Sequence, residues 1–286
     1  MLAVVFGVLG AASNATGTAF QREAASTLKQ GGGLHFVLML VRKPAWTIGV
    51  LGVMGAALFQ ALALLNGPIA LVQPLFVLEL PFALIIVGHL LHRRIPSEGW
   101  YGVASVVAGL GLLLGAAAPH GGGAQAPLSR WIPALVVCYA LMAGAVVISR
   151  APSSPQVRAV TLGVAAAVGN ATTAALLKSA TTTFSDHGVV AFLSAWQTYG
   201  FALTGIAAVL LLENALQAGP LAASQSALTI GDALVSLVLG VTVFQETIRA
   251  GAWILLELLG LVFMCFGVFL LTRAIPRIRT VGRRAA

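Results

Sequence analysis

Charged side chains are scarce in this chain. Only 8% of its 286 residues are Asp, Glu, Lys or Arg, whereas 59% are hydrophobic and the mean hydropathy is +0.97. So few polar groups could not cover the surface of a soluble protein of this length. The scarcity excludes a soluble domain and indicates an integral membrane protein, whose first partner is the lipid bilayer.

Cysteine and clustered histidine are also lacking. The two cysteines, Cys138 and Cys265, each lie inside a hydrophobic run, and neither belongs to a Cys-x-x-Cys or Cys/His cluster. The five histidines are scattered over loops and helix ends. Only His89 and His92 are spaced as a possible ligand pair, and they stand beside Arg93 and Arg94, which disfavour a metal. No other set of residues resembles a metal site or a nucleophile with its base. We therefore expect no enzyme activity and no cofactor, and no metal ligand is assigned.

Hydrophobic runs are long enough to cross a bilayer, which takes about 20 residues of helix. Nine such runs lie near residues 1–20, 45–65, 69–91, 99–117, 131–149, 158–177, 190–212, 220–243 and 250–272. These predict an all-α membrane protein, a polytopic bundle of nine transmembrane helices. A shorter run within about 31–43 is interpreted as an interfacial helix, with a weaker counterpart at Val189–Leu193. Ten spans is the alternative.

Basic residues are distributed unevenly between the loops. Nine spans place 13 of the 16 Lys and Arg residues on one side, the side of the C-terminus. Because such residues prefer cytoplasmic loops, we expect the N-terminus outside and the C-terminus in the cytoplasm of an inner (plasma) membrane. Topology thus accounts for the net charge of +8 without a nucleic-acid partner. The segment 274–286 is expected to be a basic cytoplasmic tail, and no signal peptide is predicted.

The chain contains an internal duplication. Residues 6–25 and 162–181 are identical at eight of 20 aligned positions, where roughly two would arise by chance. Gly67-Pro68 is matched by Gly219-Pro220 in the same alignment. This predicts a first repeat at 1–118, a linking span within 119–156 and a second repeat at 157–273. One linking span inverts the second repeat, as in transporters that enclose one site at the bilayer midplane.

Three acidic residues interrupt the predicted spans. Glu79, Asp232 and Glu257 stand within otherwise hydrophobic stretches, where burial of a carboxylate costs several kcal/mol. The repeat alignment places Glu79 opposite Gly231, one residue from Asp232, so these two acids are expected to converge and to carry protons or a cation. Glu257 is a second-rank candidate, because it could pair with Arg249 instead. The alternative for each is a neutral acid with a structural hydrogen bond.

Uncharged polar side chains accompany these acids. Gln225 and Thr229 extend a stripe on one face of the span that carries Asp232. Gln73 shares a span with Glu79, and the prolines on either side of Glu79 are expected to loosen that helix. Asn14 and Asn170 are matched by the duplication. We expect these five residues to bind a solute, although both asparagines could equally join helices to one another.

Two further expectations concern the ends of the helices. All five tryptophans fall near the start of a predicted span, which is typical of anchors at the membrane interface. The glycine-rich loop His120–Ala126 is expected to be a flexible connector.

The two repeats, the polar third helix VQPLFVLELPFALIIVGHLLHRR and Gln245-Glu246 after the eighth helix resemble the drug/metabolite transporter (DMT, EamA-like) superfamily. The nine-span count and the first helix are most similar to its NIPA-type, magnesium-transporter-like branch. The resemblance implies an inner-membrane carrier that works by alternating access, without a cofactor, and leaves a homodimer open.

Physical chemistry then ranks the cargo. Mg²⁺ holds its water tightly and is usually met by carboxylates through those waters, so Glu79 and Asp232 facing one cavity would be a plausible but sparse site. A carrier of a small organic metabolite or drug needs one or two buried acids as a proton relay, with Asn and Gln to bind the solute. We therefore favour proton-coupled transport of an organic solute, with transport of a divalent cation such as Mg²⁺ as the alternative.

Overall fold

The computed structural model describes residues 1–26, 43–90, 95–151, 154–249 and 251–283. Within these ranges, nine stretches of helix are long and hydrophobic enough to cross a membrane. The chain is thus a multi-pass, all-α membrane protein, as the sequence predicts. The expected short helix at about 31–43 lies almost entirely outside the described residues.

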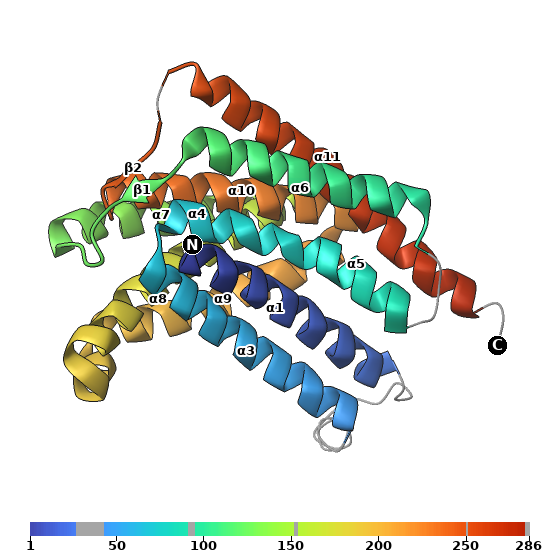
Figure 1. Cartoon of the computed structure of the whole chain (residues 1–286), viewed down its shortest axis with the longest axis horizontal. Helices are drawn as coiled ribbons and strands as arrows, with labels where there is room; N and C mark the ends of the chain where they lie inside the picture. Colours follow the sequence, from blue (N-terminus) through green and yellow to red (C-terminus); the bar gives the residue numbers. More distant parts are fainter. Residues whose placement is uncertain (27–42, 91–94, 152–153, 250, 284–286) are drawn as a thin grey trace.

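The helical elements follow one another with short connections. In order they are α1 (Leu2–Ser26), α3 (Pro44–Asn66), α4 (Ile69–Leu75), a 3-10 turn (Phe76–Leu78), α5 (Glu79–Leu90), α6 (Ser97–Ala117), α7 (Leu128–Arg150), α8 (Pro155–Ser194), α9 (Trp196–Ala218), α10 (Leu221–Thr242) and α11 (Trp253–Arg283). Two short strands, β1 (His120–Gly121) and β2 (Glu246–Thr247), pair antiparallel at one end of the bundle (Figure 1).

The third span is interrupted and the eighth is continuous. α4, the 3-10 turn and α5 together cover the predicted run at 69–91. Pro74 lies inside α4 and Pro81 inside α5, and each lacks the backbone N–H that a regular helix requires. Glu79 begins α5 directly after the 3-10 turn. The loosened helix expected from the prolines is therefore present at the level of Glu79.

Helix α8 is longer than the sixth span predicted at 158–177. It runs over 40 residues and breaks only at Gly188, whose φ of 78° lies in the left-handed region that favours glycine. Beyond this break, Val189–Leu193 forms the last turns of α8, and the rings of Phe184 and Phe192 meet edge to face across it at 5.8 Å. The predicted short element before the seventh span is thus helical.

The helices pack in pairs that follow the duplication. α1 lies along α3 and α8 along α9, while α6, the last helix of the first predicted repeat, packs against α11, the last helix of the second (Figure 1). The α6–α11 contact is close: a Cβ added at Gly109 would lie 2.5 Å from the carbonyl oxygen of Gly260. Small residues bring membrane helices this close because they remove the side chain between the two backbones.

The core lies around α8, where α4, α7 and α10 meet it. Side chains from the four helices form one buried cluster, which includes Val72, Trp131, Leu176 and Leu239. Elsewhere the bundle exposes a large hydrophobic surface, for example Leu203 on α9 and Leu255 on α11. Such a surface is suited to lipid rather than to water.

Candidate functional site

Asp232 is the most deeply buried of the acids predicted from the spans. It lies in the middle of α10, and only 8% of its surface is exposed. Both carboxylate oxygens are bonded: Asn170 on α8 donates its amide to Oδ2 at 3.2 Å, and Gln73 on α4 donates its amide to Oδ1 at 3.5 Å. The carboxylate is thus held by neutral amides, and no cation of the described residues forms an ion pair with it.

These amides join the two predicted repeats. Gln60 on α3 donates its amide to Oε1 of Gln73 at 3.1 Å, so that Gln60, Gln73, Asp232 and Asn170 form one chain of hydrogen bonds. The chain passes from α3 and α4 in the first repeat to α10 and α8 in the second. Gln73 is 2% exposed, whereas Asn170 is exposed, so the network reaches from the protein interior to an accessible surface.

The first repeat contains a related pair. Asn14 on α1 donates its amide to Oε2 of Glu79 at 2.8 Å, and both residues are half-buried. In the second repeat, Asn170 and Asp232 make the equivalent bond between α8 and α10. The duplicated asparagines therefore have the same role in the two halves, that of donating an amide to an acid on the third helix of their own repeat. The convergence of the two acids on one solute stays a prediction.

The other residues of the predicted polar stripe on α10 differ in how deeply they are buried. Thr229 is buried, as is Ser236, which lies one turn beyond Asp232, whereas Gln225 is half-buried. These residues share the face of α10 that carries Asp232, because they recur at helical spacing. This face provides hydroxyl groups beside the carboxylate.

Glu257 and Arg249 do not form the pair that their spacing suggested. The Arg249 guanidinium lies over the ring of Trp253, with its Cζ 5.3 Å from the centroid. Oε1 of Glu257 is buried and has no hydrogen-bond partner among the described residues. Glu257 is half-buried and takes no part in the hydrogen bonds around Asp232. We find no support for Glu257 in the candidate site.

A buried ion pair was missed by the sequence analysis. Lys178 Nζ lies 2.8 Å from Oε1 of Glu246, and both side chains are almost fully buried. The same carboxylate accepts hydrogen bonds from the backbone N–H groups of Ile69 at 2.7 Å and Ala70 at 3.0 Å, at the start of α4. Lys178 also lies over the ring of Phe244, 4.6 Å from its centroid. Glu246 thus ties α8 and β2 of the second repeat to α4 of the first.

The position of Lys178 in the sequence could have indicated this ion pair. The sixth span predicted from the hydrophobic run ends at residue 177, which would place Lys178 in a loop. The helix in fact continues through it, and a lysine inside a hydrophobic helix requires a partner. Glu246 lies in a strand after α10, and sequence spacing alone does not indicate which acid reaches Lys178.

The surroundings of this ion pair correct two further expectations. Trp131 is 1% exposed and meets the rings of Trp196 and Phe244 edge to face at 5.6 and 5.8 Å, so it is a core residue and not an interface anchor. The loop His120–Ala126 is not free: β1 pairs with β2, and Gln125 donates its amide to the carbonyl of Ser179 at 2.9 Å. Hydrogen bonds hold this connector in place.

Comparisons with known proteins add no function. No family model matches the chain. It is similar to an uncharacterized protein of Corynebacterium glutamicum, with 29% identity over 257 residues, 88% of each chain. No solved structure matches. Fold and composition therefore define a multi-pass membrane protein. Only the site described above bears on its activity.

Proposed function

We propose that this protein is a secondary transporter that moves a small organic metabolite or drug across the membrane by alternating access, coupled to protons. The observation that carries the proposal is the amide network around Asp232. The Asp232 carboxylate at mid-helix accepts from two amide side chains, one from each half of the chain, and Gln60 supports one of them. A carboxylate is costly to keep in a bilayer. In membrane proteins, acids buried in this way typically lie on solute or proton pathways.

Protonation of Asp232 could make the amides around it exchange the carboxylate for a solute. A neutral carboxylic acid donates one hydrogen bond and needs fewer donors around it, whereas the ionised form accepts from several. A change of protonation at Asp232 would therefore release the amides of Gln73 and Asn170 to bind a polar solute. Glu79 and Asn14 would act in the same way in the first repeat. Thr229 and Gln225 line the same face and would orient the solute.

The resemblance to drug/metabolite transporters agrees with this proposal, and so does the duplication. In this scheme the repeats are inverted, the N-terminus lies outside and the site is exposed alternately to the two sides. The ion pair of Lys178 and Glu246 lies at the end of the bundle that carries β1 and β2. Glu246 also accepts from the backbone N–H groups of Ile69 and Ala70 in the first predicted repeat, so opening that end requires these contacts to rearrange.

An organic solute is favoured over Mg²⁺ by the donors around Asp232. Both of its oxygens accept from amide N–H groups, which repel a cation. Among the described residues, no three His, Cys, Asp or Glu side chains come together as metal ligands. Mg²⁺ usually retains waters and binds one or two carboxylates, so the divalent cation stays in the experiment as a competing cargo.

Transport by purified protein in liposomes tests the proposal. A panel of small metabolites and drugs is offered with and without a pH gradient, and Mg²⁺ flux is measured in parallel. We expect uptake of an organic solute that depends on the gradient and is lost in Asp232→Asn. Mg²⁺ flux that is lost in Asp232→Asn would reverse the ranking, and absence of any flux that responds to Asp232→Asn would refute the transport function.

A further inference from the structure

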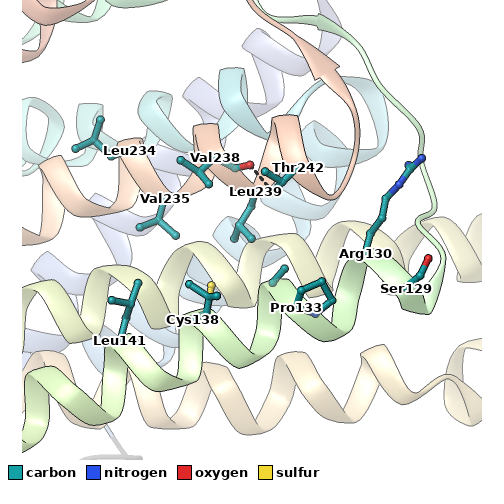
Figure 2. Close-up of a pocket in the computed structure, with 12 residues that line it drawn as sticks. Ser129, Arg130, Pro133, Cys138, Leu141, Leu234, Val235, Val238, Leu239 and Thr242 are labelled. Carbon is teal, nitrogen blue, oxygen red and sulfur yellow. Dashed lines mark hydrogen bonds between the residues drawn. The ribbon is translucent and has the colours of Figure 1, made fainter.

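A groove of about 520 Å³ runs between α7 and α10 on the surface of the bundle (Figure 2). Its lining is hydrophobic along most of its length. The residues are Ser129, Arg130, Pro133, Ala134, Val137, Cys138, Leu141, Leu234, Val235, Val238, Leu239 and Thr242. Figure 2 shows Ser129 and Arg130 at one end of the groove and Leu141 and Leu234 at the other. The groove therefore has a polar end and a long hydrophobic part.

The groove opens toward the bilayer and not toward the Asp232 network. Val137 and Leu141 on α7, with Leu234 and Val238 on α10, are all exposed. On α10 these side chains lie away from the stripe of Thr229, Asp232 and Ser236, which is buried. Exposed hydrophobic residues at this level of a membrane helix meet acyl chains.

The length of the groove matches one leaflet. From Arg130 to Leu141 there are eleven residue steps in α7, which correspond to about 16 Å of helix. This is about half of a hydrocarbon core about 30 Å thick. Because Arg130 lies in the first turn of α7, the polar end falls at the level of the headgroups and the other end near the midplane.

Arg130 is the only charged side chain of the lining, and it is exposed. Its guanidinium forms no ion pair or hydrogen bond with the part of the chain that the structure describes. The Thr242 hydroxyl, by contrast, is already engaged, since it donates to the carbonyl of Val238 within α10 at 2.6 Å (Figure 2). A guanidinium with free donors is complementary to a phosphate.

We propose that the groove between α7 and α10 binds one anionic phospholipid, with an acyl chain between the two helices and the phosphate at Arg130. The site goes beyond the transport function, because its lining includes neither Asp232 nor the amide side chains bonded to it. It would hold the linking span α7 against the second repeat.

Native mass spectrometry of the purified full-length protein tests the site. The probe is an equimolar mixture of palmitoyl-oleoyl phosphatidylglycerol and the corresponding phosphatidylcholine, and the ratio of bound lipids is measured. We expect the wild type to retain the anionic lipid with a preference of about fivefold, the equivalent of about 1 kcal/mol for one basic residue. Arg130→Gln should bring the ratio close to one, and Val137→Trp should displace both lipids by filling the groove.

Two matched variants serve as controls. Arg249→Gln removes another arginine that lies beyond the groove, over Trp253, and Val136→Trp adds the same bulk at an exposed neighbour that does not line the groove. Both should bind lipid as the wild type does. The proposed site would be refuted if a test variant and its control lost lipid binding equally. It would also be refuted if the wild type showed no preference for the anionic lipid. Val137→Trp that blocks solute uptake while the lipids stay bound would show instead that the solute uses the groove.

Discussion

Two buried carboxylates of this protein meet opposite kinds of partner. Asp232 is surrounded by the neutral amides of Gln73 and Asn170, whereas Glu246 meets the ammonium group of Lys178 and two backbone N–H groups. Both acids connect the first predicted repeat to the second. They differ in whether a positive charge in the protein balances the negative one.

The difference indicates different roles. A buried ion pair with additional hydrogen bonds is a fixed structural contact, because removal of either partner leaves an uncompensated charge. An acid among neutral amides lacks that balance, and a proton could supply it. We therefore expect stability to depend on Glu246 and transport to depend on Asp232, and four experiments test this division.

Glu246→Gln should have the largest effect on stability. It leaves Lys178 buried without its counter-charge, which costs about 3–5 kcal/mol, and it weakens the contact with the start of α4. The measurement is the thermal unfolding midpoint in detergent. Lys178→Met combined with Glu246→Gln should regain part of the loss, and Glu213→Gln, an exposed acid on α9, should unfold as the wild type does. A Glu246→Gln variant as stable as the wild type would contradict a structural role for Glu246.

Asp232→Asn should have the largest effect on transport. Hydrogen bonds to a charged group contribute about 1.5–3 kcal/mol, so we expect solute uptake in liposomes to fall at least about tenfold and to lose its response to the pH gradient. The unfolding midpoint should change little, because the new side-chain oxygen can still accept from Asn170, and the new NH₂ group can donate to Gln73 once the amides of Gln73 and Gln60 turn over. Collapse of the fold with unchanged specific activity of the surviving protein would reverse the division between the two acids.

Gly240→Ala tests the same region as Glu246 through packing alone. A Cβ at this position would press on Oε2 of Glu246, and overpacking of this kind typically costs about 1–3 kcal/mol. Gly144→Ala on α7 is the matched control, since nothing lies within 4 Å of its Cβ position. Thermal unfolding should separate the two variants, and equal midpoints would show that Glu246 can move without cost.

Asn170→Ala and Asn14→Ala compare the duplicated pair. Each removes one amide donor from an acid, with an expected loss of about 1 kcal/mol, or about fivefold in uptake. If both acids serve one solute, the two variants should reduce uptake to a similar extent and leave the unfolding midpoint nearly unchanged. A loss confined to Asn170→Ala would limit the transport site to the second repeat.

The sequence was sufficient for the elements that depend on local composition. Seven of the predicted spans agree with the membrane-crossing stretches to within a few residues. The seventh, predicted at 190–212, begins inside α8 and ends before Ala218, the last residue of α9, and the sixth was too short because Lys178 was taken as its end. The position of Asp232 inside a hydrophobic helix singled it out before its neighbours were known. Glu79 and Asn14 were also among the candidates, but their hydrogen bond was not predicted.

What the sequence alone determined is the membrane class, the nine spans and the duplication, because hydrophobic length and repeated spacing are local properties of the chain. Only the tertiary structure decided the partners. Gln73 is 159 residues from Asp232, and Lys178 is 68 residues from Glu246. Which donor reaches which acid depends on helix packing, and packing is set by many weak contacts summed over the whole bundle.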